Sequence, residues 1–265
     1  MTAITTTELR GRQPIGASAA SAALAVARRS VLQFLRTPQV LVVGTIQPVL
    51  FLLIFRYVFG GAIDPGGVPY VDFLIPGFVT VTALFNGMST AAGMATDLEH
   101  GFVDRLRSLP IPRASVLAGR ALADTGLLAW GFGVTVALGF AVGFRLHGSW
   151  ASGLAAFGLC ILFGFAFIWL FITIGLFAGN AQAAQGMSLL VLPLIFVSSA
   201  YVPADSMPGW LQAFADHQPV TSMVDAVRNL CLGRPAGSAI AAALIWCLVL
   251  VAAFGSIAVA RFRRA

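Results

Sequence analysis

The sequence contains no lysine and has few charges of any kind. All 16 basic residues among its 265 are arginines, and charged residues make up 10% of the chain. A phosphate-binding Walker loop has the pattern G-x-x-x-x-G-K-[ST], and its lysine is indispensable. We therefore expect no ATP hydrolysis on this chain by that route, and any ATP-driven activity would need a partner.

Groups with recognisable metal or nucleophile chemistry are also scarce. Of the three cysteines, Cys160 and Cys247 lie inside apolar runs and Cys231 stands apart in a polar stretch, so no pair has metal-ligand spacing. The three histidines are far apart, and no serine or cysteine occupies a known nucleophile motif. We interpret the cysteines as packing residues and the histidines as surface residues. A membrane-embedded enzyme or an assembly factor is the least supported class.

Hydrophobic residues dominate the chain. They make up 58% of it, with a mean hydropathy of +0.90. A helix needs about 20 apolar residues to cross the ~30 Å hydrocarbon core of a bilayer. The runs of that kind predict an all-α integral membrane protein with six transmembrane helices, expected at 40–59, 76–95, 116–144, 154–178, 186–201 and 239–260.

The arginines predict the orientation of these helices. Most precede the first span, lie between the second and third, or follow the sixth; the other side holds Arg56, Arg145, Arg228 and Arg234. Cytoplasmic loops carry the excess of arginine in membrane proteins. Both termini and the segment 97–113 are therefore predicted to be cytoplasmic. The net charge of +6 indicates topology rather than nucleic-acid binding.

Three segments outside the spans have amphipathic patterns. Residues 17–36 predict an interfacial helix on the membrane surface. In 97–113, Phe102, Leu106 and Leu109 share one helical face, which would either lie on lipid headgroups or dock into another protein. The stretch 202–237 predicts two short helices on the non-cytoplasmic side. They would either rest on the headgroups or dip back between the spans.

Charged residues at the membrane boundary bear on the energy source. Arg120 and Asp124 have i, i+4 spacing and can neutralise each other at the start of the third span, and Arg56 can extend to the surface. Ion-driven transporters usually need buried carboxylates. Asp124 is the one candidate of that kind, so an ion-coupled secondary transporter is the alternative to a partner-driven one.

Two blocks of sequence resemble a known family. Glu99-x-Gly101-x-x-x-x-Leu106-x-x-Leu109-Pro110, followed by Leu117-x-Gly119-Arg120, resembles a block of the ABC-2 type exporter permeases, and most closely their daunorubicin-resistance branch. Tyr201-Val-Pro203, Met207-Pro208-Gly-Trp210, Gln218-Pro219-Val and Arg228 resemble the stretch before the last span of that family. In that family, asparagine is more common than glutamine at the position of Gln218.

The resemblance implies a permease subunit of an ABC exporter in the bacterial cytoplasmic membrane. The chain would form a single domain, with a cytoplasmic tail and amphipathic helix at 1–38 and a six-span bundle at 39–265. It would carry no cofactor, since ATP and Mg would bind a separate ATPase subunit, and a second permease subunit would complete the exporter in the lipid bilayer. The substrate would be a hydrophobic drug, lipid or glycolipid, although other branches export polysaccharides.

The resemblance also implies roles for particular residues. The segment 97–113 would be a coupling helix seated on the ATPase, and the two short helices before the last span would form an extracellular gate. The implied coupling residues are Glu99, Gly101, Phe102, Arg105, Leu106, Leu109 and Pro110, and the implied gate residues are Pro203, Pro208, Trp210, Pro219 and Arg228.

Overall fold

The computed structural model describes residue 46 and residues 49–61, 67–101 and 113–264. Within these ranges the chain is helical and forms no strand. Four of the helices are long and apolar enough to cross a membrane. They are α3 (Tyr70–Glu99), α5 (Arg113–Ala141), α6 (Trp150–Phe177) and α11 (Gly237–Arg264). At ~1.5 Å per residue each is about 42–45 Å long, which exceeds the ~30 Å hydrocarbon core. They match the second, third, fourth and sixth expected spans.

The first and fifth expected spans are shorter in the described chain. The fifth is divided into α7 (Ala181–Ser188), the 3₁₀ turn η2 (Leu189–Val191) and α8 (Leu192–Phe196). Pro193 follows this turn, and a proline ring disturbs the helix one turn before it. The first contains an apolar helix at Val49–Val58, whose last turn is the π-helix η1 (Phe55–Phe59). The described residues therefore contain four helices able to cross a membrane. The full set of six spans stays a prediction, and the expected helix at 17–36 lies outside the described residues.

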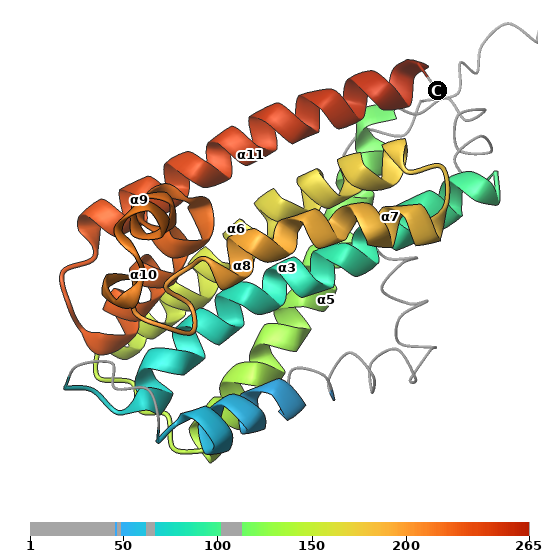
Figure 1. Ribbon diagram of the computed structural model, residues 1–265. Helices are drawn as coiled ribbons and strands as arrows, with labels where there is room; N and C mark the ends of the chain where they lie inside the picture. The colour runs from blue at the N-terminus through green and yellow to red at the C-terminus, as the bar shows by residue number, and fades with distance from the viewer. Residues whose placement is uncertain (1–45, 47–48, 62–66, 102–112, 265) are drawn as a thin grey trace, which may run out of the picture.

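Helices α3 and α6 form the centre of the bundle (Figure 1). They pack against each other, and α5 and α10 (Pro219–Leu232) pack against both. At Gly87 of α3 a side chain would overlap the ring of Phe171, and at Gly175 of α6 it would meet the backbone of Ala91. These small residues are thus used for close packing of α3 against α6 within the chain.

The outer faces of α5 and α11 are apolar. Trp130 on α5 and Ile245 and Leu248 on α11 are each more than half exposed, at 59%, 62% and 70%. Large exposed apolar side chains on long helices suit contact with lipid or another protein. The fold therefore fits a bilayer, with a buried centre formed by α3 and α6.

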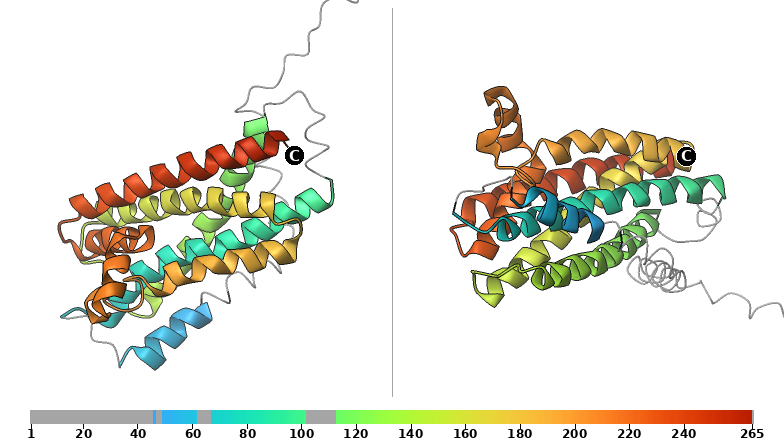
Figure 2. Two further views of the ribbon diagram at one scale, coloured as in Figure 1. Left: turned by 45° about the horizontal axis from the view of Figure 1, so that its top comes forward. Right: turned by 60° about the horizontal axis from the view of Figure 1, so that its bottom comes forward.

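The two predicted short helices differ in their surroundings. At one end of the bundle, α9 (Gly209–His217) contacts α10 and the 3₁₀ turn η3 (Ala204–Ser206), and it leaves Trp210 76% exposed. Helix α10 packs against α3, α6 and α11, and most of its side chains are buried. The end of α3, the start of α5 and the C-terminus lie at the opposite end, as the views in Figures 1 and 2 show. Of the two short helices, only α10 therefore lies between long helices, and the placement of the pair relative to the lipid stays a prediction.

Candidate functional site

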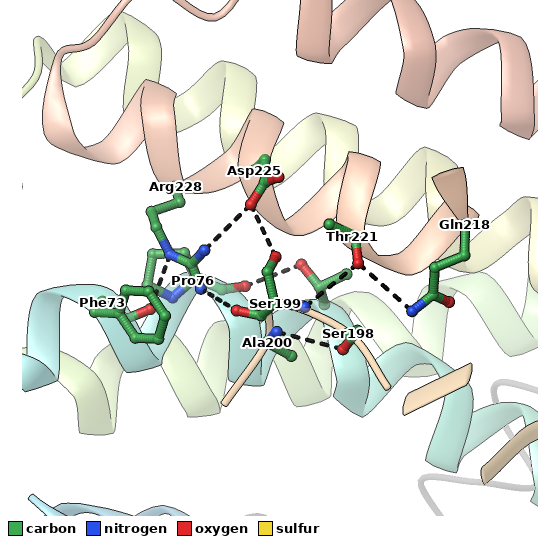
Figure 3. A network of polar contacts seen from close by, with 10 residues as sticks. Phe73, Pro76, Ser198, Ser199, Ala200, Gln218, Thr221, Asp225 and Arg228 are labelled. Atoms are coloured by element: carbon green, nitrogen blue, oxygen red, sulfur yellow. Dashed lines mark hydrogen bonds and ion pairs between the residues drawn. The ribbon is translucent and has the colours of Figure 1, made fainter. Parts of the chain in front are cut away.

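Arg228 of α10 is buried at the junction with α3 and the segment after α8 (Figure 3). Its Nε donates to the carbonyl oxygen of Phe73 at 3.3 Å, and its Nη2 donates to that of Ser199 at 2.7 Å. Its Nη1 donates to Oδ1 of Asp225 at 3.2 Å. The guanidinium carbon lies 3.7 Å from the centre of the Phe73 ring, which is a cation–π contact. One side chain thus joins three segments of the chain.

Polar side chains of α10 and of Gln218, the residue before it, also bind the backbone of α8 and of the irregular segment that follows. The amide of Ser199 donates to Oγ1 of Thr221 at 3.3 Å, and its hydroxyl donates to Asp225 at 2.8 Å. The side-chain amide of Gln218 donates to the carbonyl oxygens of Leu194, at 3.0 Å, and Val197. Non-helical backbone inside a membrane protein needs such partners, because lipid supplies none. Gln218, the departure from the family pattern, therefore has a structural function here.

The same junction brings the backbones of two segments close together. A side chain at Gly77 of α3 would overlap the backbone of Ala200. Only glycine permits this approach without displacing one of the segments. Sequence reasoning identified Arg228 but missed Gly77, Ser199, Thr221 and Asp225. The one signal that could have found them is the presence of Ser198 and Ser199 at the end of an apolar run.

The charge of Arg228 persists despite its burial. Burial lowers the pKa of its guanidinium, and the Asp225 carboxylate opposes this shift. For Asp225, burial raises the pKa, while the Ser199 hydroxyl and Arg228 lower it. Because an arginine pKa begins far above neutrality, the residue remains a cation. The junction therefore holds a buried cation, with the Asp225 carboxyl group beside it.

A second ionic cluster lies at the opposite end of the bundle. Arg120 Nε donates to Oδ2 of Asp124 at 3.1 Å, which confirms the predicted i, i+4 pair. Its Nη1 also donates to Asp97 near the end of α3, a contact that the sequence did not predict. Since Asp97 precedes the segment 102–112 and Arg120 follows it, this cluster ties together the helices on both sides of that segment.

The other predicted residues occupy varied positions. Glu99 is the exposed last residue of α3, and Gly101 has a φ of +64° just beyond it. Phe102, Arg105, Leu106, Leu109 and Pro110 lie outside the described residues. Arg56 is half-buried in η1. Among the implied gate residues, Pro203 and Pro208 precede η3 and α9, Trp210 is exposed, and Pro219 is the buried first residue of α10.

The sequence did not predict that the carboxylate of Asp72 is buried. Asp72, 2% exposed, accepts a hydrogen bond from the Arg145 amide at 2.8 Å, and its Oδ2 lies 3.7 Å from Nδ1 of His147. The second span was expected at 76–95, which left Asp72 outside it. Helix α3 instead begins at Tyr70. Asp124 is therefore not the only carboxylate to consider for ion coupling.

Two apolar cavities and three cysteines also lie in the described part of the chain. A cavity of about 170 Å³ lies between α3, α5, α6 and α10, and one of about 440 Å³ lies between α6, the α7–α8 segment and α11. Both are lined almost wholly by apolar groups. The three cysteines are free and buried, as expected of packing residues. In the part of the chain that the structure describes, no three histidine, cysteine or acidic side chains gather as metal ligands would.

Comparison with known proteins identifies the family. The model of the ABC-2 type transporter family matches residues 21–232. The chain belongs to the ABC-2 type transporter family. A daunorubicin-resistance ABC transporter permease of Streptomyces coeruleorubidus is 34% identical over 224 residues, covering 84% of this chain and 79% of that protein.

More distant relatives have similar names. A probable doxorubicin-resistance permease of Mycobacterium tuberculosis is 30% identical over 213 residues, covering 77% of this chain and 75% of the relative. A probable multidrug permease of Escherichia coli is 26% identical over 199 residues, or 74% of this chain and 53% of the relative. This ABC-2 family member is thus an integral membrane protein and the permease subunit of an ABC transporter, which confirms the resemblance.

Proposed function

We propose that this permease exports a hydrophobic drug, lipid or glycolipid across the bacterial cytoplasmic membrane, driven by a separate ATPase subunit. The drug-resistance names of the relatives support the substrate class. The observation that carries the drive mechanism is the Arg120 cluster, because it joins α3 and α5 on both sides of the segment 97–113. A push on that segment would therefore move both helices together.

Helix α3 connects the two polar clusters. Asp97 lies near its end and Phe73 near its start, so about 36 Å separates them at ~1.5 Å per residue. Phe73 contacts Arg228 of α10 through its ring and its carbonyl group. Movement of α3 at the coupling end would thus change its contact with α10 at the other. In this mechanism α10 and α9 gate the exit on the extracellular side.

The remaining parts of the exporter come from other chains. The ATPase subunit supplies the ATP and Mg sites, and a second permease subunit, identical or similar, faces this one across the transport path. The termini lie in the cytoplasm in this arrangement. The exposed apolar faces of α5 and α11 supply the surface for lipid or for that second subunit.

An ion-coupled transporter is the alternative that one observation favours, namely the buried carboxylate of Asp72. That carboxylate is bound by a backbone amide, however, and Asp124 is bound by Arg120. A relay must release and rebind its ion during each cycle. Neither carboxylate is free to do so in this conformation, which supports the ATP-driven mechanism.

Substitutions in the segment 97–113 test its proposed contact with the ATPase. Replacing Phe102 or Leu106 with aspartate puts a charge on the predicted apolar face, so the ATPase should no longer co-purify while the chain still inserts. Ser108→Asp, off that face, is the matched control and should retain the ATPase. Unchanged co-purification in the first two variants would refute the contact. Transport into vesicles that follows an ion gradient without the ATPase would refute the drive mechanism.

A further inference from the structure

The cavity of about 170 Å³ lies near the starts of α3 and α6. Its walls belong to four helices and carry no charged side chain. Ile75 and Val79 line it from α3, Val136 and Phe140 from α5, and Val227 and Cys231 from α10. Such a lining disfavours any polar occupant, since a buried polar group without a partner is costly. The cavity therefore suits hydrocarbon.

The cavity extends from the outer surface of the bundle into its interior. On α6 its lining runs from Trp150 to Cys160, ten residues or about 15 Å along the helix axis. Trp150 is 75% exposed and Leu154 72% exposed, whereas Cys160 is 1% exposed. Tryptophan at the end of a spanning helix is typical of the membrane–water interface. An acyl chain of the adjacent lipid leaflet could thus enter beside Trp150 and reach Cys160.

A cationic residue belongs to the chain segment that lines this cavity between α5 and α6. Phe144 and Leu146 line it, and Arg145 between them is exposed. The Arg145 amide is held by Asp72, but its guanidinium forms no ion pair with any residue in the described ranges. Guanidinium groups bind phosphate through paired hydrogen bonds. An anchored backbone with an unpaired cation beside an apolar cavity matches a phospholipid in both charge and polarity.

We propose that an anionic phospholipid binds at this site, with one acyl chain in the cavity and its phosphate at Arg145. The lipid comes from the leaflet that surrounds the start of α6. Its chain contacts Val227 and Cys231 and so fills the space between α10 and the spans. This inference requires only that the chain is embedded in a membrane. It is independent of the export direction and of the ATPase, so its failure leaves the proposed function intact.

The direct test is cross-linking of the full chain in vesicles that contain phosphatidylglycerol with a photoreactive diazirine near the acyl end. Mass spectrometry of the labelled peptides is expected to find adducts between Gly153 and Cys160 and between Val227 and Cys231. Adducts confined to outward residues such as Leu244 and Leu248 would overturn the proposal.

Two matched pairs of variants separate the headgroup from the acyl chain. Arg145→Gln should lower cavity labelling by phosphatidylglycerol about fivefold and leave labelling by phosphatidylcholine unchanged, because one arginine near the surface contributes about that factor. Arg234→Gln, an exposed arginine at the same end, is its control. Val136→Phe fills the cavity and should abolish labelling by both lipids, whereas Val134→Phe should not.

Equal lipid labelling of Arg145→Gln and Arg234→Gln, or of Val136→Phe and Val134→Phe, would overturn the assignment. A further measurement distinguishes a lipid from a free anion. Excess inorganic phosphate present during photolysis should not prevent labelling of the cavity, since the acyl chain holds the lipid there. Complete loss of cavity labelling in the presence of phosphate would show an anion site without a hydrocarbon site, and it would overturn the proposal.

Discussion

The guanidinium of Arg228 lies over the ring of Phe73 while its Nε donates to the carbonyl oxygen of the same residue. The first contact measures 3.7 Å to the ring centre and the second 3.3 Å between N and O. Two contacts to one residue fix the orientation of α10 on α3. Because the planar fork of arginine makes both possible, lysine cannot replace it.

Arg228→Lys should therefore lower the stability of the permease and its transport. The variant keeps the charge but loses donors to two buried carbonyl groups, at an expected cost of about 2 kcal/mol. Thermal unfolding in detergent and export from intact cells measure the two effects. Arg234→Lys, at an exposed position, is the control and should change neither. Unaltered melting and export in Arg228→Lys would contradict the role of the junction.

Gly77→Ala tests the close approach of α3 to Ala200. The added Cβ overlaps that backbone, so either α3 or the segment after α8 must shift, at a cost of about 1–3 kcal/mol. Gly133→Ala on α5 is the matched control, because a Cβ there meets no atom within 4 Å. Alanine favours a helix over glycine by up to about 1 kcal/mol, so this control should be neutral or slightly stabilising. In thermal melts, Gly77→Ala should therefore unfold at a lower temperature than Gly133→Ala.

Thiol labelling tests the predicted orientation. The native cysteines are at most 8% exposed, so a membrane-impermeant maleimide should label the parent chain weakly. Trp210→Cys and Glu99→Cys place exposed thiols at opposite ends of the bundle. With reagent outside intact cells, the first should be labelled at once and the second only after permeabilisation. Labelling in the reverse order would show that the topology is the opposite of the predicted one.

Asp124→Asn distinguishes the two energy sources. Arg120 keeps its contact with Asp97 in this variant, so the loss of stability should be about 1 kcal/mol. ATP-driven export should persist, because the carboxylate carries no ion. Asp97→Asn is the comparison, because it removes the partner that joins α3 to α5 and should therefore weaken ATP-driven export. Gradient-driven uptake that stops in Asp124→Asn alone would establish the ion-coupled alternative.

Several elements of the structure followed from the sequence alone. Long uncharged apolar runs predicted four of the spans, because few other environments accommodate them. The pair of Arg120 and Asp124 followed from helical spacing, which is local information. Helix boundaries were less predictable. The second span was expected at 76–95, yet α3 begins at Tyr70, so Asp72 was left outside the expected span.

The sequence by itself thus determined the membrane class, the absence of a Walker loop and the local ion pair. Only the tertiary structure decided what Arg228 and Asp72 contact. Arg228 bonds to a residue 155 positions away, and Asp72 accepts a hydrogen bond from one 73 positions away. Hydropathy and spacing describe single helices, whereas such contacts depend on how helices pack. The cavity beside Arg145 has the same origin, because four separate helices must meet to enclose it.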